Sequence, residues 1–154
     1  MTDVDAFRDR GVRALVLLHE RELRTCLSTW RRAVAWGVVL PSTSERDASP
    51  QAVFRHVLSA SGSYLHWLAE HLELGDPGLE PPPDVADVEA RADGYVEHLL
   101  GRWRSVLRDV PRERLRESHP TRWGVDLVVE AMLEHAIVHP MRHALQLEEL
   151  MTPG

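Results

Sequence analysis

The stretch SPQAVFRHVLSASGSYLHWLAEHLELG, residues 49–75, carries clear signals for the beginning and end of a helix. Ser49 is a preferred N-cap residue, Pro50 suits the first helical position, and Gly75 fits a helix end. Between them, apolar side chains recur every three or four residues, the period of one helix face. The stretch therefore predicts an amphipathic helix from Pro50 to about Leu74, with an apolar stripe of Val53, Phe54, Val57, Leu58, Leu65 and Leu68.

Three further helices are predicted outward from this stretch. Upstream, the same apolar spacing runs from about Asp5 to Val38, and a loop at Pro41–Ser49 follows. Downstream, the prolines at 81–83 exclude a helix and separate a third helix, about Asp84 to Asp109, from the second. A fourth runs from about Gly124 to Leu150. Because no strand alternation is evident and four amphipathic helices bury their apolar faces best together, we predict an all-α four-helix bundle, a single domain over residues 1–154.

The composition narrows the class of protein. The net charge is −6, which argues against nucleic acid as a partner, because nucleic-acid binding needs a basic surface. No apolar run approaches the roughly 20 residues that cross a bilayer, and no signal peptide is visible. Cys26 is the only cysteine, so no internal disulfide is expected. We therefore expect a cytoplasmic protein without a membrane partner.

All eighteen basic residues are arginines. A functional interpretation would make them phosphate clamps. Because the arginines are scattered along the chain, we interpret them instead as a compositional bias.

Three histidines at four-residue spacing, His135, His139 and His143, lie on the predicted fourth helix. Successive members are about 40° apart around the helix and about 6 Å apart along it, so they form one row that overlaps the apolar stripe. Buried imidazoles are costly unless each nitrogen finds a partner, and a metal ion is a common partner for several. The alternative is a set of histidines that only pack or form hydrogen bonds.

Two histidines at i and i+4 can bind one ion, but a catalytic site usually has three protein ligands. The third must come from another helix. On a helical wheel, His56 lies beside the apolar stripe of the second helix, whereas His66 lies on its polar side. His56 is the better candidate on this ground, and His66 stays open.

These residues resemble the DinB/YfiT-like superfamily of metal-binding four-helix bundles. The segment Val53-Phe-Arg-His56-Val resembles a histidine context in the second helix of that family, and His135, His139, His143 and Gln146 match its fourth-helix motif in order. The resemblance implies an up-down-down-up bundle. It also implies metal ligation by His56, His139 and His143, with His135 as a neighbour one turn earlier.

Pro140 and Arg142 lie between the proposed ligands His139 and His143 in the sequence. Pro140 removes a helical hydrogen bond and clashes with the carbonyl of Ala136, so the helix should kink there. The kink could misalign the ligands or turn His143 toward the ion. Arg142 plots near the inward stripe and is expected to line the site or to extend to solvent.

The resemblance also implies what the site could do. Some relatives are thiol-dependent transferases or isomerases that use a low-molecular-weight thiol. Imidazole ligands do not select one transition metal, and we expect zinc or nickel. The first hypothesis is a metal-dependent thiol S-transferase or hydrolase. The alternative is a non-catalytic, metal-stabilised bundle that acts as a stress-related binding or dimerisation module. A homodimer is expected from the resemblance.

The remaining aromatic and sulfur-bearing residues are interpreted as packing groups. Trp36 and Trp123, near predicted helix ends, could instead edge a pocket or a dimer surface. Cys26 lies on the apolar row of the first helix and is expected to be buried. The histidines without a partner at ligand spacing are expected to be surface or packing residues; they are His19, His66, His71, His98 and His119.

Overall fold

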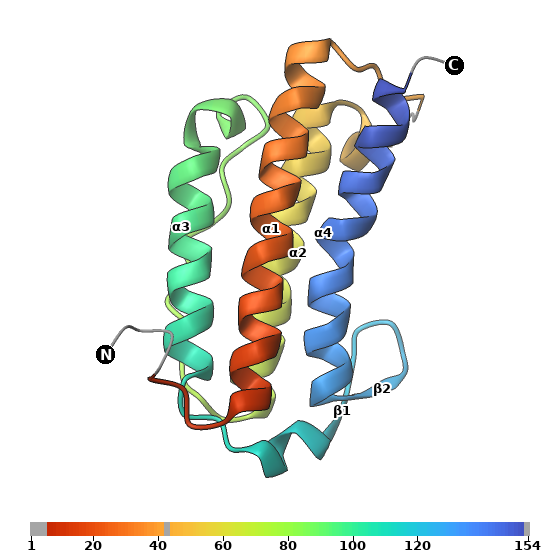
Figure 1. Cartoon of the computed structure of the whole chain (residues 1–154). Helices are drawn as coiled ribbons and strands as arrows, with labels where there is room; N and C mark the ends of the chain where they lie inside the picture. Colours follow the sequence, from red (N-terminus) through yellow and green to blue (C-terminus); the bar gives the residue numbers. More distant parts are fainter. Residues whose placement is uncertain (1–5, 42–43, 153–154) are drawn as a thin grey trace.

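The computed structural model describes residues 6–41 and 44–152, and this part of the chain consists mainly of four long helices (Figure 1). The helices are α1 Arg10–Trp36, α2 Pro50–His71, α3 Val88–Leu107 and α4 Val129–Met151. The shorter elements are two 3-10 turns, η2 Glu45–Asp47 and η3 Arg112–Arg116, and two strands, β1 Ser118–Pro120 and β2 Asp126–Val128. The prediction of a four-helix, all-α bundle is confirmed, with a short hairpin added.

The helices lie side by side along one axis. In Figure 1, α1 and α4 run upward and α2 and α3 run downward. The connection between α2 and α3, residues 72–87, returns along the length of the bundle. Helix α4 packs against both α1 and α2, so residues on α2 and α4 can share one site.

Local hydrogen bonds explain where the helices begin and end. The Asp9 carboxylate caps α1 by accepting from the backbone N–H groups of Gly11 and Val12. Ser49 Oγ caps α2 by accepting from Ala52 N at 3.0 Å, as the sequence predicted. At the end of α1, Gly37 adopts φ +79°, a left-handed conformation that glycine adopts without steric cost.

The predicted helix bounds were too generous. Helix α1 begins at Arg10, and the predicted start at Asp5 lies outside the described residues, as do residues 42 and 43 of the predicted loop. Helix α2 ends at His71, and α3 spans Val88–Leu107 in place of residues 84–109.

The prediction that the chain contains no strands is wrong. β1 and β2 pair as an antiparallel hairpin in which His119 lies opposite Leu127. Its turn contains Gly124 at φ +87°, so the residues predicted to begin the fourth helix are a turn and a strand. Three-residue strands are too short to display alternation, which is why the sequence pattern did not reveal them.

Two clusters of buried side chains form the core. One surrounds the stacked rings of Trp30 and Phe54, whose centroids lie 4.6 Å apart. The other contains Trp103, which is fully buried. Cys26 lies in the first cluster, where burial raises the pKa of its thiol to about 12. The packing roles predicted for Trp30, Trp103 and Cys26 are confirmed.

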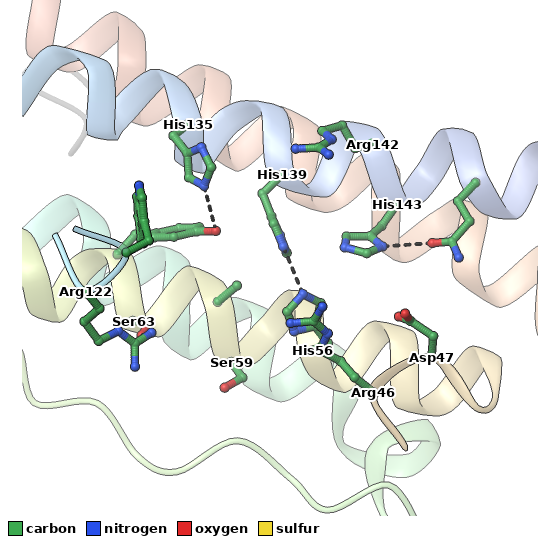
Figure 2. Close-up of a pocket in the computed structure, with 14 residues that line it drawn as sticks. Arg46, Asp47, His56, Ser59, Ser63, Arg122, His135, His139, Arg142 and His143 are labelled. Carbon is green, nitrogen blue, oxygen red and sulfur yellow. Dashed lines mark hydrogen bonds between the residues drawn. The ribbon is translucent and has the colours of Figure 1, made fainter. Parts of the chain in front are cut away.

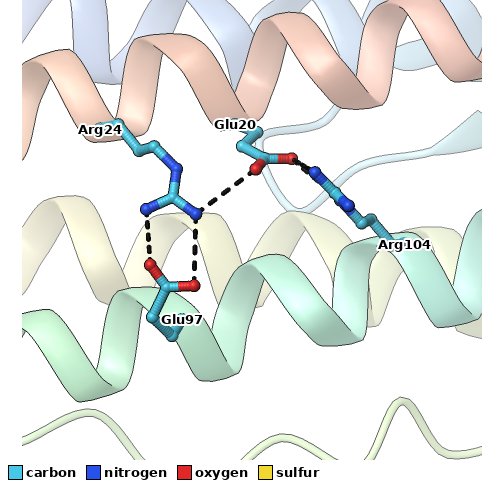
Figure 3. Close-up of polar contacts among 4 residues, drawn as sticks. All are labelled: Glu20, Arg24, Glu97 and Arg104. Carbon is cyan, nitrogen blue, oxygen red and sulfur yellow. Dashed lines mark hydrogen bonds and ion pairs between the residues drawn. The ribbon is translucent and has the colours of Figure 1, made fainter. Parts of the chain in front are cut away.

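Ion pairs join α1 to α3 on the outside of the bundle (Figure 3). Arg24 pairs with Glu97, and Arg104 pairs with Glu20. Each pair is partly exposed, and such pairs typically contribute about 0–1 kcal/mol. These ion pairs therefore fix the positions of the arginine side chains but contribute little to the free energy of unfolding.

None of the helices within the described ranges has the length and apolar character needed to cross a bilayer. The cytoplasmic location stays a prediction.

A buried polar group connects α1, α2 and α3. His19 is 1% exposed and stacks on Trp103 with ring centroids 4.0 Å apart. Ser61 Oγ lies 3.0 Å from His19 Nε2 and accepts from Trp103 Nε1 at 3.2 Å. The other ring nitrogen, His19 Nδ1, has no hydrogen-bond partner among the described residues. His19 is therefore a packing residue that the folded protein keeps neutral.

His19 should make the protein sensitive to acid. Burial lowers the pKa of His19 from 6.5 to about 3. The unfolded chain therefore takes up this proton at higher pH, so the stability from neutral His19 is complete above pH 6.5 and is lost as the pH falls toward 3. One such proton changes the unfolding free energy by about 1.4 kcal/mol per pH unit, and His19→Leu should flatten the pH dependence by about that slope. Urea unfolding between roughly pH 4 and 7 measures both slopes, and parallel curves would contradict this assignment.

Candidate metal centre

Three histidines from two helices converge between α2 and α4 (Figure 2). His56 lies in the second turn of α2, and His139 and His143 lie one turn apart on α4. The His56 ring centroid is 4.9 Å from that of His139 and 5.2 Å from that of His143, and the last two are 4.7 Å apart. Each ring offers one nitrogen such that all three nitrogens lie within 4.8 Å of one another.

The spacing of the nitrogens fits a shared ion. His56 Nε2 and His139 Nε2 are 3.1 Å apart. Two imidazole nitrogens bound to one tetrahedral zinc ion at about 2.0–2.1 Å lie about 3.3 Å apart. The separation of His56 and His139 therefore fits one ion, and with His143 inside 4.8 Å this three-histidine cluster could hold a metal. Elsewhere in the described residues, no other group of three such ligands meets this distance.

Pro140 does not separate the ligands. Helix α4 continues through Pro140, and His139 and His143 face the same point on either side of it. Of the two outcomes left open for Pro140, misalignment of the ligands or a turn of His143 toward the ion, the misalignment is absent.

Gln146 orients His143. Its Oε1 atom accepts a hydrogen bond from His143 Nδ1 at 2.9 Å. Because a neutral imidazole carries one proton, this bond leaves the Nε2 lone pair of His143 available for a metal. Gln146 thus has the role that hydrogen-bond acceptors beside metal ligands usually have.

Gln146→Leu should weaken metal binding without removing a ligand. Losing the acceptor that orients a metal-bound histidine typically lowers affinity roughly 10- to 100-fold. We expect that loss for zinc, measured by competition with a chromogenic chelator. Gln146→Glu keeps an acceptor oxygen and serves as the control, so equal affinity in the Leu and Glu variants would contradict the role of this bond.

The environment keeps His139 and His56 neutral, which is the form that binds metals. Burial, together with the neighbouring His143 and His56, lowers the pKa of His139 to about 3. Burial likewise lowers the pKa of His56 to about 4. His139 Nδ1 is buried without a hydrogen-bond partner among the described residues, so this ring lacks the acceptor that Gln146 provides for His143.

His135 is a neighbour of the cluster and lies outside the group of three nitrogens. Its Nε2 atom lies 3.1 Å from the hydroxyl of Tyr64, and its ring is 5.7 Å from that of Trp123. Arg142, His135 and the three-histidine cluster line one cavity. The other candidate for third ligand, His66, is exposed and does not line it.

The cluster forms part of the wall of a cavity of about 820 Å³. Four residues of the cavity wall were predicted from the sequence as site residues, namely the three histidines of the cluster and His135. Arg142 and Trp123 were predicted as candidates for lining a site or pocket. Several others were missed, namely Arg46, Asp47, Ser59, Ser63, Tyr64 and Arg122. Ser59 and Ser63 stand three and seven residues after His56, so helical spacing could have found them. Nothing in the sequence pattern placed the hairpin residue Arg122 beside α2.

The remaining histidines lie outside the cluster. His71 and His119 stack with centroids 4.8 Å apart, and His119 Nε2 is 3.1 Å from a Glu117 oxygen. His98 Nε2 accepts from the backbone N–H of Glu80. Their prediction as surface or packing residues fits these contacts.

Comparisons of the chain with models of known protein families, with curated proteins and with solved structures found no match. The resemblance to the DinB/YfiT-like superfamily therefore rests on the residues of this chain.

Proposed function

We propose that the chain is a divalent-metal-dependent enzyme of the DinB/YfiT-like superfamily, a thiol S-transferase or a hydrolase. Zinc or nickel is the proposed ion, and a low-molecular-weight thiol or another small molecule is the proposed substrate. One observation carries the proposal: His56, His139 and His143 surround a single point in the wall of a large cavity.

Two features support the family assignment. His56, His139 and His143 meet in space as the motif resemblance implies, and Gln146, the last residue of the motif, accepts a hydrogen bond from His143. The helix directions in Figure 1 follow the up-down-down-up order of such bundles. A single domain over residues 1–154 is part of the same proposal.

The chain's own residues prepare the site for catalysis. His56, His139 and His143 would hold a divalent ion through neutral imidazoles, which would leave it its full charge and open positions; the ion would supply a lowered pKa for a bound thiol or water, or polarisation of a carbonyl. Burial raises the pKa of Tyr64, although the charges of Arg142 and Arg122 oppose this, so its hydroxyl stays protonated. The pair of Tyr64 and His135 therefore holds a proton at the cavity wall, within reach of a bound molecule.

A non-catalytic dimerisation module is the second candidate, and exposed apolar residues on α4 favour it. Val138, Met141 and Leu145 are 44%, 44% and 55% exposed at helical spacing. Such a module requires a metal site closed to small molecules, whereas the three histidines line an open cavity. Sedimentation analysis with and without metal distinguishes the two: a metal-dependent dimer without metal-dependent catalysis supports the module.

Metal analysis of protein purified without chelators tests the proposal. We expect about one zinc or nickel ion per chain, since the three nitrogens can share only one ion. Chelation should abolish thiol transfer or hydrolysis in a substrate screen, and zinc or nickel should restore it. Less than about a tenth of an ion per chain, with no uptake on reconstitution, would sink the proposal.

A further inference from the structure

Several arginines on the outer side of the bundle are paired with carboxylates, as Arg24 and Arg104 are in Figure 3. Three others, Arg46, Arg122 and Arg142, line the cavity beside the histidines. Within residues 6–41 and 44–152, none of these three forms an ion pair with a carboxylate.

Two of the cavity arginines lie on different sides of the cavity. Figure 2 shows Arg122 beside Ser63 on the α2 side and Arg142 on α4 between His139 and His143. The charges of both oppose the rise that burial causes in the pKa of Tyr64. Among the residues that the structure describes, Arg122 donates to Ser63 Oγ at 3.3 Å, a neutral partner that does not compensate the guanidinium charge. The one carboxylate in the cavity wall is Asp47, which Figure 2 shows beside Arg46 at the end near His56 and His143. The end near Arg122 has no such carboxylate among the lining residues.

An aromatic surface accompanies these charges. Trp123 follows Arg122 in the hairpin turn, is 51% exposed, and has its ring beside that of His135. Tyr64 forms the adjoining wall, with its ring centroid 5.1 Å from that of His135. This end of the cavity therefore offers the Arg122 guanidinium next to an apolar surface, while Arg142 and the three-histidine cluster lie farther along α4 (Figure 2).

We propose that the compound bound in this cavity carries an oxyanion, a carboxylate or a phosphate, that the guanidinium charges of Arg122 and Arg142 attract while its reactive end reaches His56, His139 and His143. This inference rests on the proposed function, because it names the substrate class of the same site. Guanidinium groups bind both oxyanions through paired N–H donors. Unpaired cations in a cavity of an otherwise acidic chain attract such ligands, and the cavity volume suits a small molecule.

The test uses the full chain loaded with Co(II), whose absorption bands change when a thiol binds the ion. The probes are 3-mercaptopropionate and 3-mercaptopropan-1-ol, which have the same chain length and thiol but differ in the carboxylate. We expect the carboxylate to bind about tenfold or more tightly, as charge-assisted hydrogen bonds do in mutational series. 2-Mercaptoethyl phosphate forms a third arm, and its affinity relative to the carboxylate identifies the preferred oxyanion.

Variants assign that preference to the arginines. In the Arg122→Gln, Arg142→Gln double variant, the ratio between the charged and neutral thiols should fall to about one, with the affinity for the neutral thiol unchanged. Arg116→Gln is the control for the loss of a positive charge away from the cavity, because Arg116 is exposed and lies outside the cavity; each Arg→Gln exchange removes one charge. It should keep the wild-type ratio.

The outcomes separate this inference from the proposed function. If Co(II) does not bind, both are overturned. If Co(II) and the neutral thiol bind but the wild-type protein shows no preference for either anion, only the present inference is overturned. A preference that survives in the double variant, or that Arg116→Gln removes equally, overturns it too.

Discussion

Replacing His139 by alanine is expected to lower the affinity for zinc or nickel roughly a hundredfold to a thousandfold. A structural zinc site binds with about 10–16 kcal/mol shared among four ligands, so one ligand is worth roughly 2.5–4 kcal/mol. The ring of His139 lies 4.9 Å from that of His56 and 4.7 Å from that of His143. Chelator competition with the purified variant measures the change.

His135→Ala is the matched control for this variant. It removes an imidazole from the same helix, one turn earlier, but His135 is outside the group of three nitrogens. Its affinity for metal should stay close to that of the wild type. Equal losses in the two variants would mean that the row of histidines on α4 acts as a whole, and the three-ligand assignment would be wrong.

Trp103→Ala should be the most destabilising substitution discussed for this chain. The Trp103 side chain is fully buried, stacks on His19 and donates to Ser61. Truncating a buried tryptophan costs roughly 3–5 kcal/mol, which is a large part of the stability of an ordinary domain. Urea unfolding of the metal-free protein provides the free energy.

Trp36→Ala serves as the comparison, because Trp36 is 61% exposed. It should change the unfolding free energy by roughly 0.5 kcal/mol or less. Trp103→Phe should fall between the two, since it keeps an aromatic ring beside His19 and loses the N–H group that reaches Ser61. If Trp36→Ala cost as much as Trp103→Ala, the assignment of the core would have to be revised.

The helices were predictable because their signals are local. A cap such as Ser49 and an apolar residue at every third or fourth position act within one turn, and α2 begins at the predicted residue. The hairpin was not predictable in the same way. Its pairing joins His119 to Leu127 across a glycine turn, and strands of three residues leave no periodicity to read.

The residues of the candidate site also differ in whether local sequence signals could predict them. His139 and His143 share a helix, so their spacing alone placed them together. The choice between His56 and His66 depended on how α2 is rotated against α4, which a helical wheel only approximates. The structure brings His56 to the cluster and leaves His66 exposed. Arg122 contacts Ser63 across 59 residues of chain, a proximity that only the packed fold produces.

The hairpin between η3 and α4 and the long helices contribute different residues to the candidate site. The histidines belong to helices whose opposite faces form the core, so their positions are tied to the stability of the whole protein. Arg122 and Trp123 belong to a surface turn in which all of residues 122–126 are exposed. Exchanging that turn should therefore change which molecules bind in the cavity without changing the affinity of the three histidines for a metal ion. One scaffold could in this way evolve, or be engineered, to bind many ligands.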